Sequence, residues 1–113
     1  MSCIFCEIGA GRIPADVVYS SSDVTAFRDI NAQAPTHLLV IPNRHVNSIA
    51  ELESTDTSLL ANLFFVANEL ARREGIAETG YRVITNCGPN GGQTVQHLHL
   101  HLMGGRAMGW PPG

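Results

Sequence analysis

Residues 97–102 read His-Leu-His-Leu-His-Leu, and this strict alternation constrains the fold more than any other part of the chain. Successive side chains of a β-strand point to opposite faces of its sheet, so the alternation predicts a strand, which we extend over residues 95–103. The three leucines should pack against a helix, and the three imidazoles should line an open face. A polar strand face is normally built from Thr, Lys, Glu or Ser. Three histidines in register therefore indicate a functional site.

The spacing along this strand divides the three histidines between two tasks. Residues two apart lie about 6.8 Å apart along a strand, and residues four apart lie about 13 Å apart. Neighbouring imidazoles can therefore converge on one phosphate or metal, whereas His97 and His101 cannot easily share it. We expect one adjacent pair to act together and the outer histidine to serve elsewhere.

The rest of the chain predicts an α+β fold with an antiparallel sheet, one main helix and a short N-terminal helix. Apolar residues recur at helical spacing over 57–73, with Thr55 or Asp56 as N-cap and Gly75 after the C-terminus. The other expected elements are a helical turn over 4–11, strands over 17–19, 24–29, 37–41 and 81–86, a turn over 88–92, and an irregular tail over 104–113.

Composition and charge exclude several classes of protein. With 113 residues and 44% hydrophobic content, we expect one domain spanning 1–113. A net charge of −3 argues against a nucleic-acid partner. No apolar run approaches the ~18 residues of a membrane span, and the N-terminus lacks a signal-peptide pattern, so we expect a cytoplasmic protein without a membrane partner. All seven cations are Arg, which excludes Schiff-base chemistry on lysine.

Several segments besides 97–103 carry a pattern that extends over nearly the whole chain: the Cys/Ile/Phe opening, 26–30, 33–37, 91–94 and the Trp-Pro-Pro-Gly ending at 110–113. Together they resemble the Hint branch of the histidine triad (HIT) superfamily of nucleotide hydrolases and transferases. The resemblance implies a HIT-like fold and an adenosine 5′-monophosphoramidase-like hydrolase. Such an enzyme cleaves P–N or acyl-phosphate bonds of purine nucleoside 5′-phosphoramidates through a nucleotidyl-histidine, releasing a nucleoside monophosphate and an amine.

The resemblance also implies a role for each site residue. His99 would attack the α-phosphorus, while His101 and His37 would flank the phosphate and stabilise its charge without a catalytic metal. Thr94 would bring a hydroxyl near the phosphate at a position where the branch commonly has Ser. Asp29 would accept hydrogen bonds from the ribose hydroxyls. The remaining implied nucleotide contacts are Phe5, Ile8, Phe27 and Ile30 at the base, Asn86 in the nucleotide region, and Gly92 and Gln93 in the turn beside the phosphate.

Simpler explanations exist for most of these residues. Core packing accounts equally well for the four apolar side chains, and a hydrogen-bonded core position accounts for His37. A plain hairpin turn explains 91–94, and a turn position explains Asn86.

Cys3 and Cys6 are separated by two residues, which is the spacing of half a tetrahedral zinc site. A redox pair or two buried thiols would show the same spacing, and three cysteines do not suggest a disulfide framework. Relatives with this pair complete the site with two histidines, which here implies His45 and His97 and a structural Zn²⁺. Cys87 should be a small buried residue beside the turn.

Leu and Phe cover more of the helix at 57–73 than one core face needs, which predicts a second buried face and a homodimer, as the resemblance also implies. In relatives the tail reaches the neighbouring subunit's site, so Trp110 and Arg106 would help select the leaving group. Docking of Trp110 on its own subunit is the alternative.

Two other functions stay open: a dinucleoside polyphosphate hydrolase, and a nucleotide-binding or zinc-stabilised interaction module with little turnover.

Overall fold

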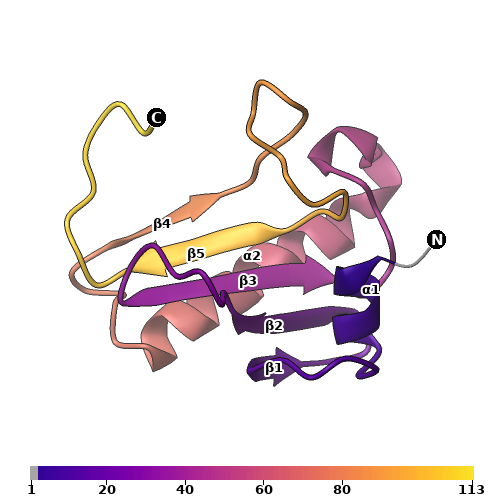
Figure 1. Ribbon diagram of the computed structural model, residues 1–113, viewed down its shortest axis with the longest axis horizontal. Helices are drawn as coiled ribbons and strands as arrows, with labels where there is room; N and C mark the ends of the chain where they lie inside the picture. The colour runs from indigo at the N-terminus through magenta and orange to yellow at the C-terminus, as the bar shows by residue number, and fades with distance from the viewer. Residues whose placement is uncertain (1–2) are drawn as a thin grey trace.

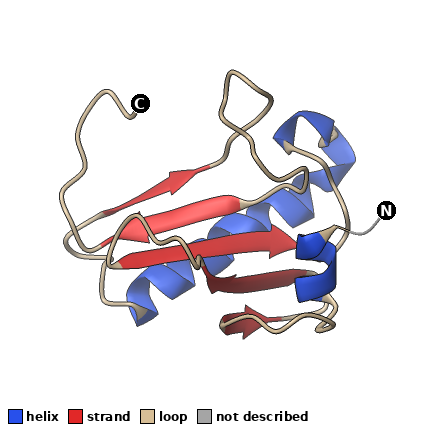
Figure 2. Ribbon diagram, in the orientation of Figure 1, coloured by secondary structure: helices blue, strands red, loops and turns tan. Residues whose placement is uncertain are grey.

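The computed structural model describes residues 3–113 and shows a five-stranded antiparallel sheet between a long helix and a short one (Figures 1 and 2). The α+β fold is therefore confirmed. Among the described residues, no helix combines the length and hydropathy needed to cross a membrane. In chain order the elements are α1 (Ile4–Gly9), β1 (Val17–Ser20), β2 (Val24–Arg28), β3 (Thr36–Pro42), two short 3₁₀ turns (Ile49–Glu51 and Ser54–Asp56), α2 (Thr57–Arg73), β4 (Tyr81–Ile84) and β5 (Leu100–Gly104).

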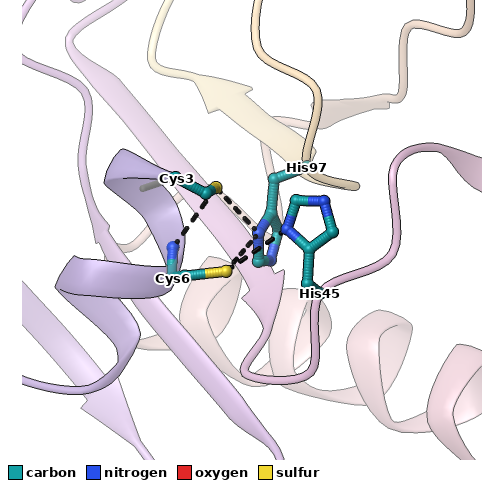
Figure 3. A group of neighbouring side chains, drawn as sticks. All are labelled: Cys3, Cys6, His45 and His97. Carbon is teal, nitrogen blue, oxygen red and sulfur yellow. Dashed lines mark hydrogen bonds between the residues drawn. The ribbon is translucent and has the colours of Figure 1, made fainter. Parts of the chain in front are cut away.

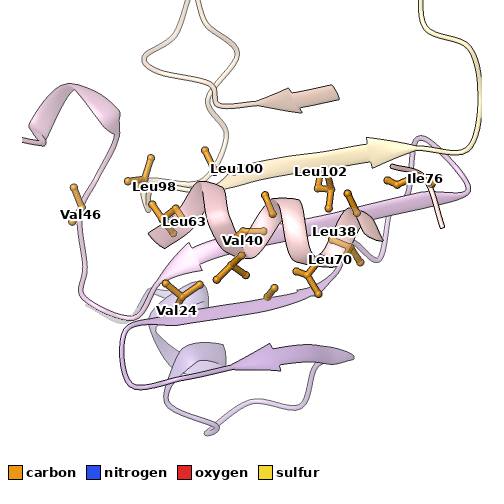
Figure 4. Close-up of a cluster of buried hydrophobic side chains, with 14 residues drawn as sticks. Val24, Leu38, Val40, Val46, Leu63, Leu70, Ile76, Leu98, Leu100 and Leu102 are labelled. Carbon is orange, nitrogen blue, oxygen red and sulfur yellow. The ribbon is translucent and has the colours of Figure 1, made fainter. Parts of the chain in front are cut away.

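The sheet has the strand order β1-β2-β3-β5-β4, which puts β3 at its centre. Every residue of β3 is buried, because helices cover both faces of the sheet at this strand. Leu38 and Val40 face α2 and join the larger core cluster (Figure 4). Leu39 and Ile41 face the other way and pack in a smaller cluster with α1. The central strand thus links the stabilising core to the opposite face, where the histidines lie.

The alternating segment forms a shorter strand than the predicted 95–103. β5 begins at Leu100, and residues 95–99 lie outside the sheet. Val40 pairs with Leu100, so two further steps of the register would set Leu98 opposite Pro42. Proline has no N–H to donate to the ladder. The Leu98 N–H instead donates to the Val46 carbonyl at 2.6 Å.

The expected division of side chains nevertheless holds. Leu98, Leu100 and Leu102 all lie in the core cluster that contains α2, as predicted. The main helix covers 57–73 as expected, with Asp56 at its N-cap position but without a side-chain capping bond. The N-terminal helix ends at Gly9, before the expected residue 11. The irregular tail begins at Gly105, because Gly104 still belongs to β5.

Candidate active site and metal site

His97 and His101 belong to two separate clusters, as their spacing predicts. His97 joins two cysteines and another histidine, whereas His101 joins a histidine and an aspartate. His99 lies between them, with its ring centroid 4.9 Å from that of His101. The expected open face is wrong: His97 is fully buried and His99 is only 5% exposed. The cause is α1, whose Phe5 ring lies 6.0 Å and 5.2 Å from these two rings.

The hydrogen bond of His99 fixes which of its ring nitrogens carries the proton. Its Nδ1 lies 2.7 Å from the carbonyl oxygen of His97. A carbonyl oxygen only accepts, so Nδ1–H must be the donor, and a neutral ring then holds its free lone pair on Nε2. The buried His99 therefore has the electronic form of a nitrogen nucleophile.

His37 and His101 form a directed pair of imidazoles. The Gln33 backbone N–H donates to His37 Nδ1 at 3.0 Å, so the proton of a neutral His37 is on Nε2. This Nε2–H faces His101 Nδ1 at 2.9 Å and the Asp29 Oδ2 atom at 3.4 Å. Because His101 Nδ1 accepts, the proton of His101 is on Nε2. Both rings are thus arranged as hydrogen-bond donors in series.

Burial keeps these two rings neutral near pH 7. Desolvation is the main cause that lowers the pKa of His101 to about 4, and the neighbouring His99 and His37 lower it further. Desolvation also lowers the pKa of His37, against the opposing effect of the Asp29 carboxylate. The tautomers assigned to His37 and His101 are therefore the forms present at neutral pH.

The second group of side chains, which we call the Cys/His cluster, consists of Cys3, Cys6, His45 and His97 (Figure 3). Each residue contributes one potential metal-ligand atom, and these four atoms all lie within 4.8 Å of one another. Cys3 Sγ is 3.4 Å from His97 Nδ1, and Cys6 Sγ is 3.5 Å from the same nitrogen and 3.2 Å from His45 Nδ1. Both thiols belong to the start of α1. Cys6 lies in the helix, and Cys3 is its N-cap residue, whose side chain accepts from the Cys6 N–H.

Each histidine of the Cys/His cluster presents a lone pair to the two sulfur atoms. His97 Nε2 lies 2.8 Å from the Pro42 carbonyl and must donate to it, which leaves Nδ1 unprotonated. His45 Nε2 lies 2.7 Å from Asn47 Oδ1, and the Asn47 amide nitrogen donates to Glu51, so this oxygen is the acceptor. Two imidazole lone pairs and two thiols therefore converge on one point, which is a ligand set that suits Zn²⁺.

The four apolar residues expected at the base do not share one environment. Phe5, Ile8 and Phe27 are buried together in the cluster between α1 and the sheet, where the Phe5 and Phe27 rings meet edge to face at 5.4 Å. Ile30 lies apart from them, fully exposed in the loop before β3. Asp29 Oδ1 in the same loop accepts from the Asn31 N–H at 2.8 Å.

The turn after β4 holds the remaining predicted contacts. Asn86 Nδ2 donates to the Gly91 carbonyl, and the Gln93 side chain accepts from the Gly88 N–H and donates to the Asn47 and Val95 carbonyls. Gly92 has a φ of +76°, which glycine adopts without strain. Thr94 is exposed and lines a cavity of about 580 Å³ with Cys3, Ile4, His45, Asn47, Val95 and Gln96.

The expectation of a buried Cys87 is wrong. Its side chain is exposed because the residue lies past the end of β4, where the chain has left the sheet.

The sequence also did not identify Gln33 and Asn47 as partners of site histidines. Gln33 contacts His37 through its backbone N–H, and no residue pattern reveals a backbone contact. Asn47 follows His45 by two residues in an irregular segment, so no periodicity indicates their contact.

Comparisons with known proteins agree with this geometry. A family model described as the HIT domain matches residues 10–108. The purine nucleoside phosphoramidase of Escherichia coli (strain K12) is 47% identical over 94% of this chain and 89% of its own length. The 14 kDa zinc-binding protein of Zea mays is 49% identical over 97% of this chain and 87% of its own length. The crystal structure of a HIT family hydrolase from Legionella pneumophila Philadelphia 1 superposes with a TM-score of 0.97 at 52% identity, covering 99% of this chain and all of that one. The chain therefore belongs to the histidine triad (HIT) family.

Proposed function

We propose that this protein hydrolyses purine nucleoside 5′-phosphoramidates and related acyl phosphates through a nucleotidyl-histidine on His99. The observation that carries the proposal is the buried His99 ring, whose Nδ1–H donates to the His97 carbonyl and whose Nε2 lone pair has no hydrogen-bond partner among residues 3–113. The printed name of the Escherichia coli relative, purine nucleoside phosphoramidase, supports this substrate class.

In the first step the Nε2 lone pair of His99 forms a bond to the α-phosphorus. The bond from phosphorus to the amine breaks, and the amine leaves with a proton from solvent. In the second step water attacks the same phosphorus, the bond from phosphorus to Nε2 breaks and the water gives a proton to solvent. The nucleoside monophosphate then departs and the neutral imidazole is restored. The hydrogen bond from Nδ1–H to His97 holds the ring in the reactive tautomer through both steps.

His101 and His37 supply hydrogen-bond donors to the phosphate. His37 Nε2–H donates to His101 Nδ1, so the proton of His101 is on Nε2, where it can be donated to a phosphate oxygen. A donor aimed at developing negative charge in a site with little water stabilises the transition state. Thr94 and the backbone of Gly92 add polar groups from the turn after β4.

The nucleoside would lie beside α1 and the loop before β3. Asp29 is the candidate acceptor for the ribose hydroxyls, although its Oδ2 atom also faces His37. The exposed Ile30 can cover one face of a base, whereas Phe5, Ile8 and Phe27 form an apolar floor. Asn86 and Gln93 act in this proposal by shaping the turn, because the structure already engages their side chains within it.

A turnover assay tests the function directly. The protein is incubated with adenosine 5′-phosphoramidate, and amine release is followed for the wild type and for His99→Ala. We expect turnover in the wild type and its loss in the variant. Dinucleoside polyphosphates are assayed in parallel, and turnover of these alone would point to the other hydrolase class. Nucleotide binding without turnover of either substrate would indicate a binding module and refute the proposal.

We also infer that the Cys/His cluster binds a structural Zn²⁺. Tetrahedral zinc with bonds of about 2.3 Å to sulfur and about 2.05 Å to nitrogen separates these ligands by about 3.6 Å. The S···N distances of 3.2, 3.4 and 3.5 Å are close to this value. The name of the Zea mays relative, a zinc-binding protein, agrees.

Elemental analysis of protein purified without added metal should give about one equivalent of zinc per chain, and Cys3→Ser should lose most of this zinc. A wild type without zinc would refute the inference.

A homodimer is the third part of the proposal. On α2, Phe65 is 68% exposed and Phe64 is 41% exposed, and Tyr81 on the edge strand β4 is also exposed. Large exposed side chains on a helix, together with an exposed edge strand, favour burial against a second copy. The exposed Trp110 and Arg106 of the tail would then be placed to reach the partner's site and help select its leaving group.

A further inference from the structure

His97 belongs to both parts of the site at once. Its side chain is a member of the Cys/His cluster, and its carbonyl oxygen accepts the Nδ1–H of His99 at 2.7 Å. The same residue therefore holds a candidate metal and fixes the tautomer of the candidate nucleophile. Any rotation of the His97 backbone would move the acceptor on which the free Nε2 of His99 depends.

A second link runs through α1. Cys3 and Cys6 flank Phe5, whose ring meets the His99 ring at 5.2 Å with an interplanar angle of 88°. An isolated helix of six residues is not stable in water, so α1 keeps its place only through its contacts. These contacts include the packing of Phe5 and Ile8 against the sheet and the two thiols of the Cys/His cluster.

A third link runs through the loop after β3. His45 Nε2–H donates to Asn47 Oδ1 at 2.7 Å, and the Asn47 carbonyl accepts from Gln93 Nε2 at 2.6 Å. Gln93 in turn accepts from the Gly88 N–H at 3.0 Å, which closes the turn that leads to Thr94. The second imidazole of the cluster is thereby tied to the turn beside the proposed phosphate site.

We propose that the Cys/His cluster is a positioning centre for His99, and that its metal occupancy sets the rate of nucleotidyl transfer. The proposal rests on the function proposed above. When bound, Zn²⁺ fixes four ligands in one tetrahedron, which here joins α1, the loop at 45–47 and the segment that carries His97. Without it, the thiols and the imidazole lone pairs share only weak sulfur hydrogen bonds. The His97 carbonyl, Phe5 and the turn at 88–93 are then free to shift, and small misplacements of a nucleophile are costly to its rate.

The test compares three metal states of the full chain. They are the zinc-loaded wild type, the wild type stripped with a chelator, and His45→Ala, which removes an exposed ligand and leaves the buried core intact. His45→Cys is the conservative rescue, because it restores a fourth ligand. Ile76→Ala is the matched control, since it loses stability at a buried position outside the cluster. Zinc content and helicity are measured on every sample.

Two readouts are followed. The first is the NMR signal of the His99 Nδ1 proton, which reports its hydrogen bond to His97 without any substrate. The second is the single-turnover rate of nucleotidyl transfer from adenosine 5′-phosphoramidate. In stripped protein and His45→Ala we expect the Nδ1 proton to exchange at least about tenfold faster and the transfer rate to fall about tenfold. His45→Cys should recover both in proportion to its zinc content, and Ile76→Ala should change neither.

Stripped, folded protein with an unchanged Nδ1 signal and rate would overturn the proposal. So would equal losses in Ile76→Ala, because these would indicate a general effect of stability. If zinc-loaded protein shows no turnover, the proposed function fails, yet the Nδ1 signal still decides whether the cluster positions His99.

Discussion

Each of the five imidazoles has a neighbour whose role as hydrogen-bond donor or acceptor decides which ring nitrogen carries the proton. Carbonyl oxygens accept from His97 and His99, a backbone N–H donates to His37, and the remaining two rings follow from their partners. The lone pairs of His45 and His97 therefore face the thiols, and that of His99 stays free. The sequence predicted the division of the histidines, but not these tautomers, because partners such as the Gln33 N–H are backbone groups.

His101→Ala should lower kcat by about 100-fold while changing KM little, because it removes a donor that acts on developing charge. His101→Gln retains an N–H donor and should recover part of the loss. Steady-state assays with adenosine 5′-phosphoramidate measure both values. A rise in KM at constant kcat would show that His101 contributes only to ground-state binding.

Acidification should destabilise the protein through His101. Its folded pKa of about 4 lies below the usual 6.5, so the folded state binds fewer protons than the unfolded state between these values. The free energy of unfolding should therefore fall as the pH drops from about 6.5 to about 4, by at most about 1.4 kcal/mol per pH unit for this ring.

Urea unfolding over this pH range checks the prediction. Wild type and His101→Gln are compared in the same metal state, so that other titrating groups cancel. The free energy of unfolding of the wild type, relative to that of His101→Gln, should fall as the pH drops from about 6.5 to about 4. A difference that stays constant from pH 6.5 to pH 4 would contradict it.

At the scale of elements, β3 and β5 connect the core to the site. The period of two in residues 97–102 correctly assigned the leucines to the side of α2. It did not predict where β5 begins, because the strand can only continue as far as its partner offers hydrogen bonds, and β3 ends at Pro42. α2 was predicted closely, since its apolar spacing is local information. The cover that α1 places over His97 and His99 is a long-range contact, which periodicity does not report.

Leu102→Ala should lower the free energy of unfolding by about 3 kcal/mol, because Leu102 is fully buried in the core cluster and the cavity cannot close easily. Leu59→Ala, at a partly buried position of α2, should cost only about 1 kcal/mol. Denaturant unfolding measures both values. Equal losses would mean that the two positions contribute alike to the core.

At the scale of the whole molecule, the two faces of the sheet have separate tasks. One face and α2 form the larger core cluster, while the other face, with α1, carries the histidines. The outer side of α2 and the edge of β4 are left with exposed aromatic side chains. In the proposed dimer a second copy would cover α2 and β4, on the side of the molecule away from the histidines.

Phe65→Asp should convert the proposed dimer to a monomer, because it places a charge in the proposed apolar interface. Light scattering should give twice the 12.2 kDa chain mass for the wild type and the single mass for the variant. Val17→Asp, at the opposite edge of the sheet, is the matched control and should stay dimeric. A wild type of 12.2 kDa at micromolar concentration would contradict the dimer.

The proposed reaction requires that the Nε2 of His99 become bonded to the nucleotide phosphorus. Rapid quenching after mixing with adenosine 5′-phosphoramidate, followed by mass spectrometry of the peptides, tests it most directly. We expect one adenylyl group on His99 that forms and decays at rates sufficient for turnover, and none in His99→Ala. Amine release without this adduct, or an adduct on another residue, would contradict a reaction through His99.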